Sequence, residues 1–212
     1  MSGIHVKVCG IRRFEDAERA ADLGASALGF VFWPGSPRYV DPYRAQAIVR
    51  ALPPFVTPVG VFVDQAPEFV ERVASLVRLG AVQLHGREPA EYCARIRTRV
   101  IKAGGERDLD DVARFPAPIV ILLDVHDPVR HGGTGRTVNW ETARAIAATR
   151  RTILSGGLRP DNVAGAVALE RPYGIDVASG VESSPGVKDH ARLEAFFAAL
   201  QPARAGVARA GG

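Results

Sequence analysis

The feature that most constrains this fold is an eightfold alternation of short β-rich runs with segments of helical periodicity. The runs with strand character cover residues 5–9, 27–32, 58–63, 81–84, 100–103, 119–124, 152–154 and 174–178. Between them, apolar side chains recur at helical spacing, as Val70, Val73, Ala74 and Val77 do. Strands that alternate with helices pair in parallel, so eight such units predict a single closed (βα)8 barrel, the TIM-barrel class of α/β proteins.

Length and composition are compatible with one domain. The chain has 212 residues, 47% of them hydrophobic, which is enough for one substantial core. No GxGxxG follows the first strand run, which disfavours an open dinucleotide-binding sheet. We therefore expect a catalytic barrel domain over residues 1–200 and a disordered tail over residues 201–212, whose sequence is QPARAGVARAGG.

The sequence carries no signal for a membrane or for export. The N-terminus, MSGIHVKVCGIRR, lacks the pattern of a signal peptide, and no apolar run approaches the ~18 residues of a membrane span. Of the two cysteines, Cys93 falls in a predicted outer helix, far from Cys9 at the barrel mouth, so no disulfide is expected. These observations predict a soluble cytoplasmic protein without a membrane partner.

The net charge of +4 comes mostly from arginines that are spread over the helical segments. No block of lysine and arginine stands out, so a nucleic-acid partner is not expected. Arginines on a solvated helical surface explain most of this positive charge. An anionic small substrate is a second explanation that needs no nucleic acid.

Cys9 ends the first strand run, HVKVC, and Gly10 follows at once. The carboxyl ends of the strands form the catalytic face of a (βα)8 barrel, so a thiol there is placed to take or give a proton. A free cysteine is, however, more commonly a small buried hydrophobe. Cys9 alone does not decide between these interpretations.

Glycine-containing turns follow the last two strand runs. Gly156 and Gly157 come after the seventh, and Ser179 and Gly180 come after the eighth. Loops at these places in such barrels commonly bind phosphate through backbone N–H groups, and glycine permits a close approach. Each turn alone is commonplace, but together they predict a phosphorylated small-molecule ligand.

Asp124 ends the sixth strand run and precedes a long connection that contains Gly132, Gly133 and Gly135. Loops of this length in compact domains tend to be lids or binding loops. Asp124 could instead be a capping carboxylate, but the next helical segment begins only near Asn139. We therefore treat Asp124 as a candidate site residue and the glycines as a candidate lid.

Further candidates lie at or near strand ends, and each has a structural alternative. His85 could contact substrate or orient the base, or could be a structural histidine. Lys7 could favour a thiolate at Cys9, and Asp176 could bind a ribose hydroxyl, or the two could simply pair with each other. Lys102, near the end of the fifth strand run, raises the alternative of a Schiff-base aldolase.

Several motifs, in order, resemble those of the phosphoribosylanthranilate isomerases. They are VKVCGIRRFEDA, ALGFVFWPGSPRYV, VGVFV, AVQLHGREP, LLD with GGTGRTVNW, LSGGLRPDNV and DVASGVESSPGVKDH. The resemblance runs from about Val6 to Leu200. Departures are confined to the basic stretch of the candidate lid, DVHDPVRHGGTG, and to the Ala/Arg/Gly tail.

This resemblance implies an Amadori rearrangement in tryptophan biosynthesis, without metal or organic cofactor. N-(5-phosphoribosyl)anthranilate would be converted to 1-(2-carboxyphenylamino)-1-deoxyribulose 5-phosphate. By matched motif, Cys9 would be the general base, Asp124 the general acid, and Arg38 in SPRYV the group that holds the anthranilate carboxylate. The protein would act as a monomer or homodimer. A non-catalytic phosphosugar-binding barrel is the alternative from another class, and it predicts that the acid or base is missing.

The chemistry explains why such a site needs an acid and a base. Opening the ribosylamine ring needs a proton on the ring oxygen, and forming the enolamine needs a proton removed from C2. Ordinary pKa values, about 3.9 for aspartic acid and 8.5 for cysteine, leave both groups in the wrong state at neutral pH. The surroundings of such a pair therefore have to shift the pKa values of both groups.

Overall fold

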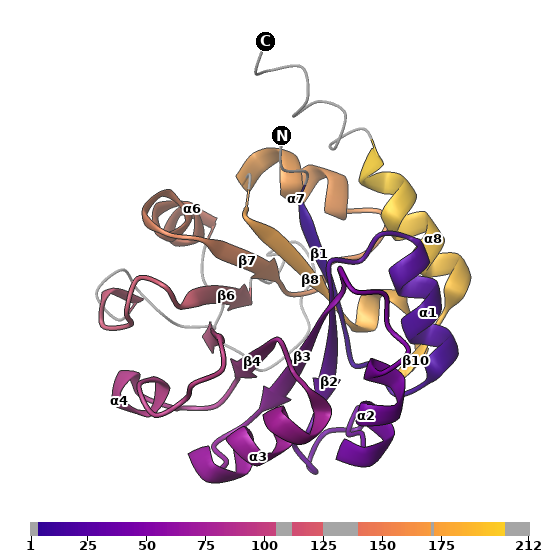
Figure 1. The fold of residues 1–212 in the computed structure, drawn as a ribbon. Helices are drawn as coiled ribbons and strands as arrows, with labels where there is room; N and C mark the ends of the chain where they lie inside the picture. Colours follow the sequence, from indigo (N-terminus) through magenta and orange to yellow (C-terminus); the bar gives the residue numbers. More distant parts are fainter. Residues whose placement is uncertain (1–3, 105–111, 125–139, 171, 202–212) are drawn as a thin grey trace.

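Eight parallel strands close into a barrel in sequence order (Figure 1). The computed structural model describes residues 4–104, 112–124, 140–170 and 172–201. The strands are β1 (His5–Cys9), β2 (Ala27–Val31), β3 (Thr57–Phe62), β4 (Ala81–Leu84), β5 (Val100–Gly104), β6 (Val120–Asp124), β7 (Thr152–Ser155) and β8 (Gly174–Val177). The predicted (βα)8 fold is confirmed, and each strand begins and ends within one residue of its predicted bounds.

Helices surround the strands as an outer ring (Figure 1). In the described residues they are α1 (Phe14–Asp22), α2 (Pro42–Val49), α3 (Pro67–Val77), α4 (Ala90–Cys93), α6 (Trp140–Thr149), α7 (Val163–Glu170) and α8 (His190–Ala199). Between β8 and α8 the chain forms a 3-10 turn, η1 (Ser179–Val181), and a small antiparallel hairpin, β9 (Glu182–Ser184) with β10 (Val187–Lys188). This hairpin was not predicted.

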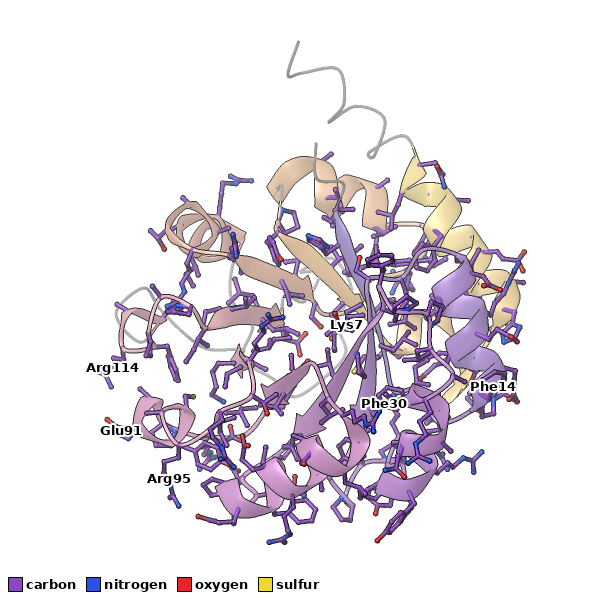
Figure 2. The ribbon with its side chains drawn as sticks, viewed as in Figure 1. Lys7, Phe14, Phe30, Glu91, Arg95 and Arg114 are labelled. Carbon is purple, nitrogen blue, oxygen red and sulfur yellow. The ribbon has the colours of Figure 1, made fainter. Side chains whose placement is uncertain are left out.

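Alternation along each strand separates two apolar layers. In β1, Val6 and Val8 belong to the large core between strands and helices, whereas Cys9 belongs to a small cluster inside the barrel. Lys7 also faces inward, and Figure 2 shows it at the centre of the ring of strands. Because successive side chains of a strand point to opposite faces of the sheet, every second residue reaches the interior of the barrel.

The predicted helical stripe is confirmed in α3. Val70, Val73, Ala74 and Val77 are all buried, because they share the face that α3 turns toward the barrel.

The arginine-rich charge is in part a surface property, as predicted. Arg19 pairs with Glu194 and Arg95 with Glu68, both at 2.6 Å and with side chains that are partly or largely exposed. Such exposed pairs contribute little to stability.

Both cysteines are buried and neither is in a disulfide, and Cys93 ends α4 in the outer layer. Within the described part of the chain, no helix has the length and apolar character needed to cross a membrane. The proposed disordered tail falls, from residue 202 on, outside the described residues.

Phe30 tests the outer core. It is fully buried between strands and helices, so Phe30→Ala should lower the free energy of unfolding by about 3–5 kcal/mol. Phe14, which is 45% exposed, provides the same substitution at the surface, and Phe14→Ala should cost much less. Denaturant unfolding of both variants measures the difference, and equal losses would contradict this description of the core.

Candidate active site

Cys9 lies at the carboxyl end of β1, with its side chain inside the barrel. It is 8% exposed and packs with Val31 and Val61 in the small interior cluster. A Cβ atom on Gly29 of β2 would come within 2.7 Å of the Cys9 sulfur. A glycine at this position therefore makes room for the thiol.

A buried ion pair lies immediately below the thiol. The Lys7 Nζ donates to Asp176 Oδ2 at 2.9 Å, and both side chains are nearly inaccessible. The two residues are register partners of β1 and β8, so they pair between neighbouring strands. Asp176 Oδ1 has no hydrogen-bond partner among the described residues, which leaves an acceptor free inside the barrel.

Burial and nearby charges act in opposite directions on Cys9. Burial raises the pKa of the thiol and outweighs the Lys7 and Lys188 ammonium groups, which lower it, while Asp176 raises it further. The expectation that Lys7 favours the thiolate agrees with the direction of its own effect. The net pKa of Cys9 is nevertheless raised, so the resting side chain is a thiol.

Asp124 ends β6 and is partly buried. Its register partner is Ser155 at the end of β7. The Asp124 charge is one of those that raise the pKa of His85, so the two side chains are close enough to interact electrostatically. The candidate lid glycines, Gly132, Gly133 and Gly135, lie outside the described residues.

His85 follows β4 and contacts Gln83 of the same strand. Gln83 Nε2 lies 2.8 Å from His85 Nδ1. Burial, followed by the charge of Lys7, lowers the pKa of His85. The imidazole is therefore neutral at pH 7, with one nitrogen that donates a hydrogen bond and one that accepts.

The two glycine-containing turns contact each other. A Cβ atom on Gly180 would collide with the backbone carbonyl of Leu158, which follows the turn after β7. Gly156 and Gly157 have φ values of +100° and +62°, and a Cβ atom on Gly157 would meet no atom within 4 Å. Ser179 begins η1 on the other side of this contact.

Arg38, after β2, is held by a residue that the sequence analysis missed. Its Nε and Nη2 donate to Glu182 of β9 at 3.0 and 2.7 Å. Glu182 also accepts from Lys188 Nζ at 2.9 Å. The motif around Glu182 and Lys188 was recognised only as part of the resemblance, since strands of three and two residues carry no periodic signal.

Lys102 has a structural environment. Its fully buried Nζ donates to Glu88 Oε2 at 2.7 Å and to the backbone oxygens of Leu84 and Gly86. A Schiff-base lysine needs a neutral amine that faces the substrate. The ion pair with Glu88 supports a role in holding the β4–α4 connection instead.

A pocket of about 730 Å³ opens at the opposite, amino-terminal end of the barrel, where His5, Thr57, Arg99 and Tyr173 are among the lining residues. It lies away from the strand ends that carry Cys9 and Asp124, so it is separate from the candidate active site. Within the described residues, no group of three or more His, Cys, Asp or Glu side chains is placed to hold a metal ion.

Comparison with known proteins decides the family. Residues 6–199 match the family described as N-(5'phosphoribosyl)anthranilate (PRA) isomerase. The chain belongs to this family. It is 50% identical over 195 residues to N-(5'-phosphoribosyl)anthranilate isomerase of Geobacter sp. (strain M21), covering 91% of this chain and 96% of that protein.

Solved structures of the family have the same fold. The phosphoribosyl anthranilate isomerase of Thermus thermophilus is 46% identical, with a TM-score of 0.84, covering 95% of this chain and 100% of that one. Another isomerase of the family is 43% identical, with a TM-score of 0.82, covering 94% of this chain and 99% of that one. That second protein was crystallised with reduced 1-(o-carboxyphenylamino)-1-deoxyribulose 5-phosphate.

The charges beside Cys9 can be tested separately. In a Cys93→Ala background, Asp176→Asn should lower the pKa of Cys9 and Lys7→Gln should raise it, because the two side chains act on the thiol with opposite signs. The thiolate absorbance in the ultraviolet, followed against pH, measures both shifts. Arg19→Gln, which removes an exposed charge, should leave the titration unchanged. Shifts of the same sign for Asp176→Asn and Lys7→Gln would contradict this account.

Proposed function

We propose that this chain isomerises N-(5'-phosphoribosyl)anthranilate by general acid–base catalysis at the carboxyl ends of its strands. It is an isomerase of tryptophan biosynthesis with a TIM-barrel fold, in keeping with its family. The observation that carries the proposed site is the convergence of Cys9 and Asp124, which end β1 and β6 at the same face of one closed barrel.

In the proposed reaction, Asp124 first donates a proton to the ring oxygen, which opens the ribosylamine ring to an imine that is protonated on its nitrogen. Cys9, as a thiolate, then removes the proton from C2 and forms the enolamine. The enolamine tautomerises to the aminoketone product. The neutral His85 and the free Oδ1 of Asp176 would hydrogen-bond the sugar, while Lys7 keeps Asp176 in position.

Two groups of residues are proposed to hold the anionic ends of the substrate. The contacting turns that contain Gly156, Gly157, Ser179 and Gly180 would bind the phosphate through backbone N–H groups. Arg38 would bind the anthranilate carboxylate, since a planar guanidinium can donate two parallel hydrogen bonds to it.

We further propose a cytoplasmic location and a monomeric or homodimeric state, and no nucleic-acid or membrane partner. Light scattering after size-exclusion chromatography distinguishes the two states. The alternative of a non-catalytic phosphosugar-binding barrel does not account for a chain that retains both Cys9 and Asp124.

The acid and base are tested by single substitutions. Cys9→Ala and Asp124→Asn should each lower kcat by about 10²-fold or more, the usual scale for a positioned proton donor or acceptor. The change in anthranilate fluorescence during the rearrangement reports turnover, and circular dichroism reports folding. Wild-type turnover by either folded variant would move that role to another residue.

Gly157 allows a matched test of the phosphate site, because its φ of +62° is one that Asn and Asp tolerate and its surroundings are open. Gly157→Asp places a negative charge at the proposed site and should weaken the binding of inorganic phosphate about 10-fold or more. The neutral, similarly shaped Gly157→Asn should change it much less. Equal affinities for the two variants in calorimetric titration would place the phosphate elsewhere. Gly180 is unsuitable for this test, because a side chain there collides with the Leu158 backbone.

A further inference from the structure

The connection between β8 and α8 carries two buried charged residues that the acid–base steps do not use. Glu182 and Lys188 are 6% and 2% exposed, and they face each other in the β9–β10 hairpin. Charged side chains are almost never buried this deeply unless they are paired. Their partners lie in the candidate active site.

Lys188 joins the hairpin to the strand ends. Its Nζ donates to the backbone oxygen of Cys9, to that of Ala178 at 3.2 Å, and to Glu182 Oε1 at 2.9 Å. An ammonium group has three protons, so these three acceptors use all of them. The ends of β1 and β8 are thereby fastened to Glu182.

Glu182 holds one defined edge of the Arg38 guanidinium. Nε donates to Oε1 at 3.0 Å and Nη2 donates to Oε2 at 2.7 Å, so the carboxylate takes the side edge of the fork. No described residue accepts a hydrogen bond from Nη1. The end edge, formed by Nη1 and the second proton of Nη2, is left for another planar anion.

The position of Arg38 brings this free edge near the base. A Cβ atom on Gly10 would lie 2.7 Å from Arg38 Cδ, so the arginine crosses directly over the residue that follows Cys9. Arg38, Glu182 and Lys188 therefore form one connected chain of contacts that begins and ends beside Cys9.

We propose that Glu182 is a positioning residue that turns the Arg38 guanidinium so that its Nη1–Nη2 edge receives the anthranilate carboxylate. Lys188 holds Glu182 at a constant distance from the Cys9 backbone, so the carboxylate end of the substrate and the base keep one spacing. This inference rests on the role of Arg38 in the proposed function.

The first test is Glu182→Gln in the full chain, assayed with N-(5'-phosphoribosyl)anthranilate. Glutamine offers Arg38 one acceptor oxygen and a donor NH2 group in place of two carboxylate oxygens, so it cannot pair with both Nε and Nη2 as Glu182 does. KM should therefore rise about 10-fold or more while kcat changes little. Glu68→Gln, which removes a carboxylate from the exposed pair with Arg95, should leave both constants unchanged. A folded Glu182→Gln enzyme with wild-type KM would overturn the proposal.

A double-mutant cycle shows whether Glu182 acts through Arg38. If it does, Arg38→Lys and Arg38→Lys with Glu182→Gln should have the same raised KM, because the second substitution then has nothing left to orient. Independent, additive increases would overturn the positioning role. If Arg38→Lys leaves KM unchanged, the substrate role of Arg38 in the proposed function fails instead, and a KM effect of Glu182→Gln would then need another cause.

Folding needs its own control, because Glu182→Gln leaves Lys188 without its carboxylate in a buried place. Glu182→Asp keeps the negative charge beside Lys188 but shortens the side chain by one methylene group, which should loosen its hold on Arg38. This variant should raise KM while the affinity for inorganic phosphate stays at the wild-type value, since the turn at Ala178 keeps its contact with Lys188. Should only Glu182→Asp fold, an unchanged KM in that variant overturns the proposal.

Discussion

The site depends on the closure of the barrel between its first and last strands. β1 and β8 pair from His5 with Gly174 to Val8 with Val177, although these residues are separated by most of the chain. This pairing sets Lys7 opposite Asp176 and brings the end of β1, with Cys9, next to the turn that follows β8. Without closure, neither the buried ion pair nor the contacts of Lys188 with both strand ends would form.

Closure also creates an unusual electrostatic environment for a thiol. Water is excluded from Cys9, and this raises its pKa, while two ammonium groups on different strands act against burial. Asp176, the partner of Lys7, limits the effect of that lysine, because its negative charge raises the pKa of Cys9. The thiolate that the proposed mechanism needs is therefore disfavoured in the free protein but supported by fixed positive charges, and the pH dependence of catalysis should reflect this balance.

The hairpin between β8 and α8 connects parts of the site that come from distant sequence segments. Burial raises the pKa of Glu182, but the hydrogen bonds and charges of Arg38 and Lys188 outweigh burial and lower it. The hydrogen bond with Glu182 in turn raises the pKa of Arg38, so these residues of β9, β10 and the connection after β2 hold one another in their charged forms. Removing one partner of a buried ion pair lowers the free energy of unfolding by about 3–5 kcal/mol, because the remaining charge is left buried without a partner. A carboxylate with two cationic partners is thus well suited to keep an arginine in one orientation.

The sequence by itself determined the eight strand–helix units, the bounds of the strands to within one residue, and the candidate acid, base and anion-binding turns. It did so because buried apolar residues recur at short, regular intervals within a strand or a helix, so the pattern is visible in neighbouring residues. Motifs such as VKVCG are contiguous, so they too can be recognised from the sequence. It left Lys7 open between support of the Cys9 thiolate and pairing with Asp176, and Asp176 open between binding a ribose hydroxyl and that pairing. Only the tertiary structure showed that the two residues pair. Likewise, Glu182 and Lys188 lie in strands too short to show a period, and their partners Arg38 and Cys9 are more than a hundred residues away in the chain, so these contacts could not be predicted. Which charges face one another, and whether burial or a neighbouring cation prevails at Cys9, depends on distances through space that exist only after the barrel has closed.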